Sequence, residues 1–128
     1  MKALLGVSAV IEAGAGLALV AFPVAAASLL VGSSSGAPSE LLVARVAGVA
    51  LLALAAGCWR ARGEARAARP LVVAMLVYDA GVAALLVHAA ATPGSSGVTP
   101  WPAAALHAGM AVWCVLALTR TVNAPDSR

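Results

Sequence analysis

Charged side chains are scarce in this 128-residue sequence, which is 62% hydrophobic and only 10% charged. A soluble domain carries about 25% charged residues, so this chain could not cover a water-exposed surface with polar groups. The two cysteines, Cys58 and Cys114, have neither metal-binding nor disulfide spacing and are expected to be small packing residues. The composition therefore predicts a membrane protein and leaves no room for a catalytic domain outside the lipid.

Four apolar runs each approach the length of about 20 residues that a membrane-spanning helix needs. Segments rich in glycine, serine and proline separate the first run from the second and the third from the fourth. We predict one all-α transmembrane domain over residues 1–128, an integral membrane four-helix bundle with up-down-up-down topology. The spans are predicted at about residues 3–22, 41–59, 71–91 and 102–118.

Local signals refine the helix ends. Pro23 should end or bend the first helix, after which residues 24–31 either continue as a bent turn or lie along the interface. Ser39 is predicted to cap the second helix, and Pro70 to occupy the first turn of the third. Two pairs of small residues have the spacing that allows close helix contact: Gly14 with Ala18, and Gly57 with Ala61.

The basic residues predict the orientation. The segment from Trp59 to Pro70 holds four of the seven arginines, whereas the loops at residues 32–40 and 92–100 contain neither lysine nor arginine. Because basic residues favour the cytoplasmic side, we expect this segment and both termini to be cytoplasmic. The excess of arginine over lysine is typical of a GC-rich bacterial genome, which predicts the bacterial cytoplasmic (inner) membrane. Trp59 and Trp101 are then expected at opposite interfaces.

Three charged residues lie inside the predicted spans, where each costs about 2.5–3.5 kcal/mol on the insertion scale. With a rise of about 1.5 Å per residue, Glu12 and Asp79 fall near the midplane, and Arg45 and His107 in the outer half. We predict that these four residues form a polar cluster, open to the outer side, that binds protons or a ligand. Tyr78 would donate a hydrogen bond to it. A purely structural role, in which the same groups hold the helices together, remains open.

Residues 11–20 and 78–87 are similar to each other, with an acid before Ala-Gly in both. The helices that contain them should run in the same direction, so this similarity predicts a parallel two-fold repeat.

His88 and His107 are candidate ligands of a b-type haem near the outer face. No haem attachment motif accompanies them, and a membrane histidine also serves as a hydrogen-bonding residue. A haem-binding membrane subunit is therefore one alternative among several.

The segments Ile11–Gly16, Ala44–Gly48, Gly57–Trp59, Tyr78–Asp79 and Trp101–His107 give the chain its recognisable pattern. This pattern resembles a group of small uncharacterised bacterial four-span membrane proteins, and the gross layout is similar to that of DoxX-like four-helix proteins. The resemblance implies the fold and brings no activity with it. The chain also resembles the small multidrug resistance transporters in having a mid-membrane acid in the first of four short helices. In that family the acid exchanges protons for a cationic drug. Glu12 would be its counterpart, although those proteins surround the acid with aromatic residues that this chain lacks.

These observations favour a non-enzymatic accessory or structural subunit with a buried polar cluster, because the sequence shows no nucleophile–base pair, metal triad or phosphate loop. A proton-coupled transporter of small molecules or ions is the main alternative. The expected partners are the lipid bilayer and either further copies of the chain or a larger membrane complex. Nucleic acid is not expected, because the basic residues lie at segment ends and form no continuous face.

Overall fold

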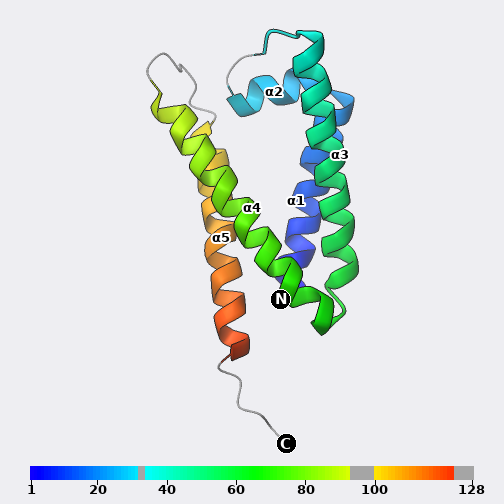
Figure 1. Ribbon diagram of the computed structural model, residues 1–128, viewed down its shortest axis with the longest axis vertical. Helices are drawn as coiled ribbons and strands as arrows, with labels where there is room; N and C mark the ends of the chain where they lie inside the picture. Colours follow the sequence, from blue (N-terminus) through cyan, green and yellow to red (C-terminus); the bar gives the residue numbers. More distant parts are fainter. Residues whose placement is uncertain (32–33, 93–99, 123–128) are drawn as a thin grey trace, which may run out of the picture.

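The computed structural model describes residues 1–31, 34–92 and 100–122, and these residues form five helices and no strand (Figure 1). The helices are α1 (Lys2–Ala21), α2 (Pro23–Val31), α3 (Pro38–Ala61), α4 (Ala65–Ala91) and α5 (Pro100–Val122). All except α2 are long and apolar enough to cross a membrane. The predicted all-α four-helix membrane bundle is therefore confirmed.

The four long helices form two antiparallel hairpins. In the first hairpin α1 packs along α3, and in the second α4 packs along α5, whereas contacts between the hairpins are much fewer (Figure 1). The hairpins approach each other at the end where α1 begins and separate towards the opposite end. The turn from α3 to α4 and the end of α5 lie at the same end as the start of α1, which we call the arginine end.

The short helix α2 settles the structure of the segment after Pro23. The backbone leaves the helical conformation at Phe22, with φ −131° and ψ 58°, because Pro23 has no N–H to continue the hydrogen-bond ladder. Figure 1 shows α2 lying across the end of the bundle opposite the arginine end. Pro23 and Ala26 are buried while Val24 and Leu29 are exposed, as suits a helix that lies along a membrane interface.

The start of α4 corrects one prediction. Helix α4 begins at Ala65, so Pro70 is its sixth residue and lies outside the first turn. The residues before Pro70 are alanines and arginines, which are strong helix formers, and the helix therefore starts earlier than the proline suggested. The connection between α3 and α4 is reduced to residues 62–64.

The start of α3 corrects the prediction that Ser39 caps this helix. Its N-cap is Ala37, with Pro38 in the first turn, so Ser39 already lies within the helix. Glu40 is in the first turn as expected, where an acid suits the helix dipole. Its carboxylate accepts hydrogen bonds from the Ser35 backbone N–H at 3.1 Å and from the Ser35 hydroxyl. The loop is thereby fastened to the helix by the acid, without a side-chain cap.

Glycines set the distance between α1 and α3, although not those in the predicted pairs. A Cβ atom on Gly16 would lie 2.8 Å from the Gly48 carbonyl oxygen, and a Cβ atom on Gly48 would lie 2.8 Å from the Gly16 carbonyl oxygen. Both positions must lack a side chain for the helices to approach so closely. Gly14 has open space around it, and Gly57 has only an ordinary contact with Leu71, so neither makes the predicted close contact.

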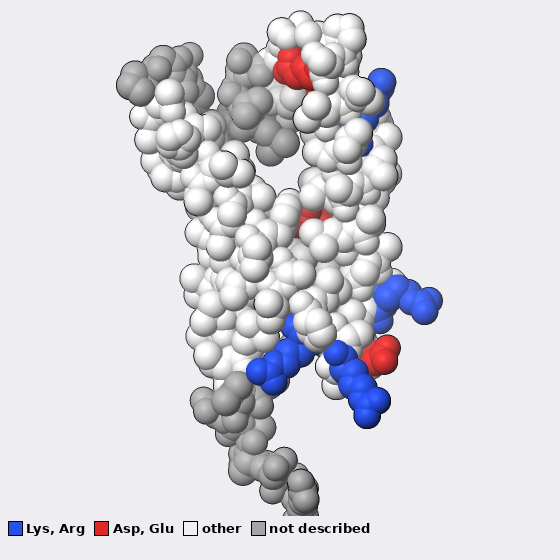
Figure 2. Space-filling view, viewed as in Figure 1, with Lys and Arg blue, Asp and Glu red and all other residues white. Residues whose placement is uncertain are grey.

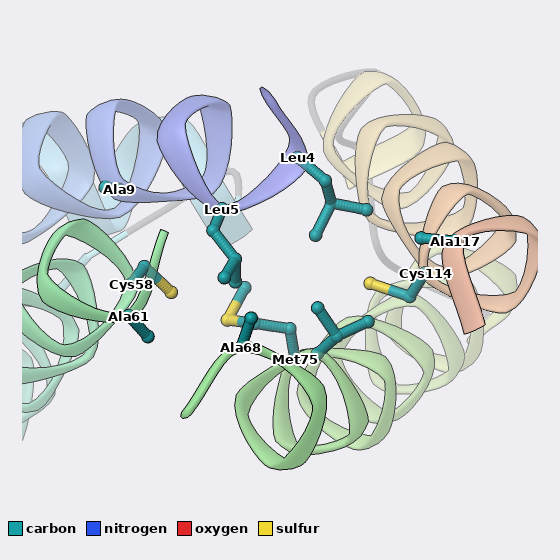
Figure 3. Packing of buried hydrophobic residues seen from close by; sticks show 10 residues of the cluster. Leu4, Leu5, Ala9, Cys58, Ala61, Ala68, Met75, Cys114 and Ala117 are labelled. Atoms are coloured by element: carbon teal, nitrogen blue, oxygen red, sulfur yellow. The ribbon is translucent and has the colours of Figure 1, made fainter. Parts of the chain in front are cut away.

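A hydrophobic cluster holds the two hairpins together at the arginine end (Figure 3). Figure 3 shows that α1, α3, α4 and α5 all contribute side chains to it. Cys58 and Cys114 are free thiols with no exposed surface, which agrees with their predicted packing role. The buried members are Leu4, Leu5, Ala9, Cys58, Ala61, Ala68, Val72, Met75, Cys114 and Ala117.

Large apolar side chains cover the outside of the bundle. Val10, Leu42, Val77 and Leu85 are each more than 60% exposed, which suits contact with lipid tails and would be unfavourable in water. Trp59 and Trp101 are half exposed and lie near opposite ends of the spans, as anchoring tryptophans do. The architecture is that of a multi-pass membrane protein.

Candidate functional site: a polar cluster between the hairpins

Helical periodicity directs Glu12 into the protein. The buried residues of α1 recur at intervals of three or four, and Ser8, Glu12 and Gly16 follow one another along this face. Glu12 is only 2% exposed, and Ser8, one turn earlier, is 1% exposed. The acid of the first hairpin therefore faces the second hairpin and is shielded from lipid.

The same periodicity directs Asp79 inward from α4. The buried residues of this helix are Ala68, Val72, Met75 and Asp79, again at intervals of three or four. Asp79 is 1% exposed, and no later residue of α4 is buried. Asp79 is thus the last fully buried residue of α4, and beyond it the helix is only partly covered.

Hydrogen bonds connect residues of three helices at this level. The Tyr78 hydroxyl donates to Glu12 Oε2 at 3.3 Å, across the two hairpins. His107 Nδ1, on α5, lies 2.7 Å from Asp79 Oδ1. The rings of Tyr78 and His107 meet edge to face, with centroids 5.6 Å apart. We call Glu12, Tyr78, Asp79 and His107 the polar cluster.

Two buried polar atoms beside these contacts have no hydrogen-bond partner among the described residues: Asp79 Oδ2 and the Ser8 hydroxyl oxygen. A buried carboxylate oxygen without a partner is costly, and a bound proton, a hydrogen-bond donor or a cation would remove that cost. The Glu12 and Asp79 carboxylates are also close enough to interact electrostatically, as are Glu12 and His107. The cluster therefore has the chemistry to hold a proton or a small cation.

The cluster lies where the hairpins begin to separate. Figure 2 shows an opening between the hairpins in the half opposite the arginine end, with acidic atoms visible near the middle of the molecule below it. On the arginine side of the cluster, the hydrophobic cluster fills the space between the hairpins. The space next to the cluster is therefore open on the side away from the arginine end and filled on the other.

Arg45 does not belong to the cluster, which corrects the sequence-based prediction. Its side chain is exposed on α3, and it forms no ion pair with the acids within the described residues. Arg45 lies in the half where the hairpins diverge, so no helix of the second hairpin covers that part of α3. His107 is therefore the basic group that lies beside the buried acids.

The structure does not bring the two candidate haem ligands together. His107 contacts Asp79, whereas His88 is exposed and lies nine residues further along α4. At about 1.5 Å per residue, this places His88 roughly 13 Å along the helix from the level of Asp79. Two axial ligands must approach the same iron atom, so this arrangement does not support a haem held by both histidines.

The predicted repeat has a counterpart in the geometry. Glu12 and Asp79 occupy matching positions of the two similar segments, and each lies in the first long helix of its hairpin. Helices α1 and α4 run in the same direction, and both acids are buried between the hairpins. Each hairpin therefore contributes one acid to the same polar cluster.

Sequence reasoning missed Ser8. Its position four residues before Glu12 places both on one face of α1, so the spacing alone could have identified it.

No protein-family model, curated protein or solved structure matches this chain. The resemblance to DoxX-like and other small four-span bacterial proteins therefore stays a prediction. The membrane assignment rests on the length and apolar character of the four long helices.

Proposed function

We propose that the polar cluster exchanges a proton for a small cation and that the protein is a proton-coupled carrier. The observation that supports this proposal is the burial of one carboxylate from each hairpin at the same level, with Asp79 Oδ2 left without a partner. Ionisable residues inside membrane spans are rare, and they commonly mark ion pathways and proton relays.

The charge of the cluster favours a cation over an anion. The cluster contains two carboxylates and one imidazole, and Arg45, which would attract an anion, is exposed and forms no ion pair with these acids among the described residues. In the proposed exchange a cation replaces a bound proton. A protonated carboxyl group releases its proton to water, and the carboxylate that remains pairs with the incoming cation. His107 can accept or return the proton, because its Nδ1 already contacts Asp79.

The two-hairpin arrangement suits a carrier. Beyond the hydrophobic cluster few contacts join the hairpins, so in the half where they separate their position can change without disturbing the packed core. A cation at Glu12 would compete for the oxygen that accepts the Tyr78 hydrogen bond. Occupancy of the site would thereby alter a contact between the hairpins, which is the coupling that a carrier needs.

The orientation forms part of the proposal. The turn between α3 and α4, Lys2 and Arg120 lie at one end of the bundle, so the positive-inside rule makes this end cytoplasmic, with N-in/C-in topology in a bacterial inner membrane. Arg128, also predicted on this side, lies outside the described residues. The opening between the hairpins would then face the outer side.

Proton release on binding of a small cation provides the test. Sodium and tetramethylammonium would be added in turn to the purified protein in weakly buffered detergent solution, and the released protons would be measured with a pH-sensitive dye. We expect release to follow binding in the wild type and to be lost in Glu12→Gln and in Asp79→Asn. Glu40→Gln is the matched control, because it removes an acid outside the cluster. Equal release from all four proteins, or none from the wild type, would reject the proposal.

An accessory subunit of a larger membrane complex is the second candidate, and one observation favours it. Arg45 is exposed among Leu42, Val46 and Val49, which are each at least 60% exposed. An arginine on such a face either extends its guanidinium to the membrane interface or pairs with a counter-charge, which an acid of a partner protein would supply. Loss of a co-purifying membrane protein in Arg45→Gln, but not in Arg120→Gln, would support this role over a carrier that acts alone.

A further inference from the structure

A groove lies at the arginine end, away from the polar cluster. It runs between the last turns of α3 and the first turns of α4 and has a volume of about 850 Å³. Sites for small ligands commonly have about 300–1,000 Å³. The groove opens on the outside of the bundle, so a molecule in the membrane can reach it without passing between the hairpins.

The lining changes character along the groove. Arg60 and Glu64 border the part nearest the turn, whereas Gly57, Leu71 and Ala74 border the part that extends towards the membrane interior. A Cβ atom on Gly57 would be 3.9 Å from Leu71, so the absence of a side chain there leaves the apolar part of the groove open. A ligand that matches this lining has a charged group at one end and a hydrocarbon chain at the other.

The charge around the groove selects the sign of that group. Four arginines lie between residues 60 and 69, with Glu64 as the single acid of that segment. Figure 2 shows that most of the visible basic side chains lie at this end of the molecule, with one near the opposite end. The Arg62 guanidinium lies 3.2 Å from the centroid of the ring of Trp59, one of the residues that line the groove, and this stacking fixes a positive charge near the end of α3.

We propose that this groove binds an anionic phospholipid, with the phosphate at Arg60, which lines the groove, and part of an acyl chain along Leu71 and Ala74. The Arg62 charge, close to Arg60 in the sequence, adds to the positive field around the phosphate. Arginine pairs with phosphate through parallel N–H donors, and basic pockets between helices at the cytoplasmic side suit lipid headgroups. Glu64 opposes an anion, so the arginines determine the sign of the preference, and Glu64 reduces its strength. This site is independent of the proposed carrier function.

Native mass spectrometry of the protein in detergent, titrated with phosphatidylglycerol, tests the proposal. Phosphatidylcholine with the same chains and glycerol phosphate without chains separate the contributions of headgroup charge and hydrocarbon. We expect phosphatidylglycerol to bind at least tenfold more tightly than either. Binding should weaken at least tenfold in Arg60→Gln/Arg62→Gln and become tighter in Glu64→Gln.

The matched control is Arg45→Gln/Arg120→Gln, which removes the same charge away from the groove and should change binding less than threefold. Equal loss in both double variants would show that net charge alone attracts the lipid and would overturn the site. Equal binding of phosphatidylcholine would overturn the preference for an anion. Equal binding of glycerol phosphate would show that the acyl chain contributes nothing, and would overturn the assignment of a lipid as the ligand.

Discussion

The Tyr78 hydroxyl donates a hydrogen bond of 3.3 Å to Glu12, and this contact joins the two hairpins at the level where their apolar packing ends. Towards the arginine end the hairpins share a hydrophobic cluster, and towards the other end they separate. The polar cluster therefore lies at the boundary between a packed half and an open half. In that position it contributes to assembly and remains close to the opening.

Removal of this hydrogen bond should weaken the association of the hairpins only modestly. Interhelical hydrogen bonds in membranes contribute about 0.6 kcal/mol on average and up to about 1.7 kcal/mol. We therefore expect Tyr78→Phe to lower the free energy of unfolding in mixed micelles by about that range. Val77→Ala, on the exposed side of the same helix, is the control and should have little effect. A loss in Tyr78→Phe no larger than in Val77→Ala would mean that the contact does not hold the hairpins together.

The close contact between α1 and α3 predicts a second result. Gly16→Ala and Gly48→Ala each place a methyl group about 2.8 Å from a backbone oxygen, so the helices must move apart. Overpacking of this kind costs about 1–3 kcal/mol. Gly14→Ala adds the same methyl group where nothing lies within 4 Å and should be tolerated. Thermal unfolding in detergent, followed by circular dichroism, would compare the three variants, and equal stability of all three would contradict the packing described.

The hydrophobic cluster predicts a large loss of stability when one of its buried side chains is truncated. Met75 has no exposed surface and lies between the hairpins, so Met75→Ala leaves a cavity that neighbouring side chains fill only in part. Truncation of a buried methionine costs about 2–5 kcal/mol. Leu85→Ala truncates an exposed residue of the same helix and should change the free energy of unfolding far less. Comparable losses in the two variants would argue against a core at the arginine end.

The proposed topology predicts where engineered cysteines react. Cys58 and Cys114 are buried, so the wild type should give little background with a thiol reagent that does not cross membranes. In intact cells Ser35→Cys should be labelled, whereas Gly63→Cys should react only after the membrane is permeabilised. Both residues are exposed and lie at opposite ends of α3. The reverse pattern would invert the orientation and place the opening on the cytoplasmic side.

The sequence alone was sufficient to predict the spans and the inward acids. Long apolar runs separated by breaker residues leave few alternatives in a membrane, and Glu12 and Asp79 are too costly to face lipid. Helix ends were harder to predict, because Pro70 and Ser39 are local signals and the helices extend past both residues. At Pro70 the propensity of the preceding alanines and arginines outweighed the single signal. At Ser39 the preceding Pro38 forms a favourable first helical residue, so α3 begins before the serine.

Arg45 shows why the membership of the cluster could not be predicted fully. Depth in the membrane follows from residue number, but the direction of a side chain depends on which helices pack together. The pairing of α1 with α3 through Gly16 and Gly48 fixes the rotation of α3, and the divergence of the hairpins leaves Arg45 uncovered. Neither the pairing of the helices nor the divergence of the hairpins can be predicted from the sequence of α3 alone.

The level of Asp79, the last buried residue of α4, has a mechanical consequence. If one hairpin pivots about the contacts at Met75, Asp79 lies about 6 Å from the pivot and Ala91 about 24 Å from it, given a rise of about 1.5 Å per residue. The tips of the hairpins would then travel about four times as far as the carboxylates. In the carrier that we propose, such leverage would turn a sub-ångström adjustment around a bound ion into a displacement of a few ångströms at the open end of the hairpins.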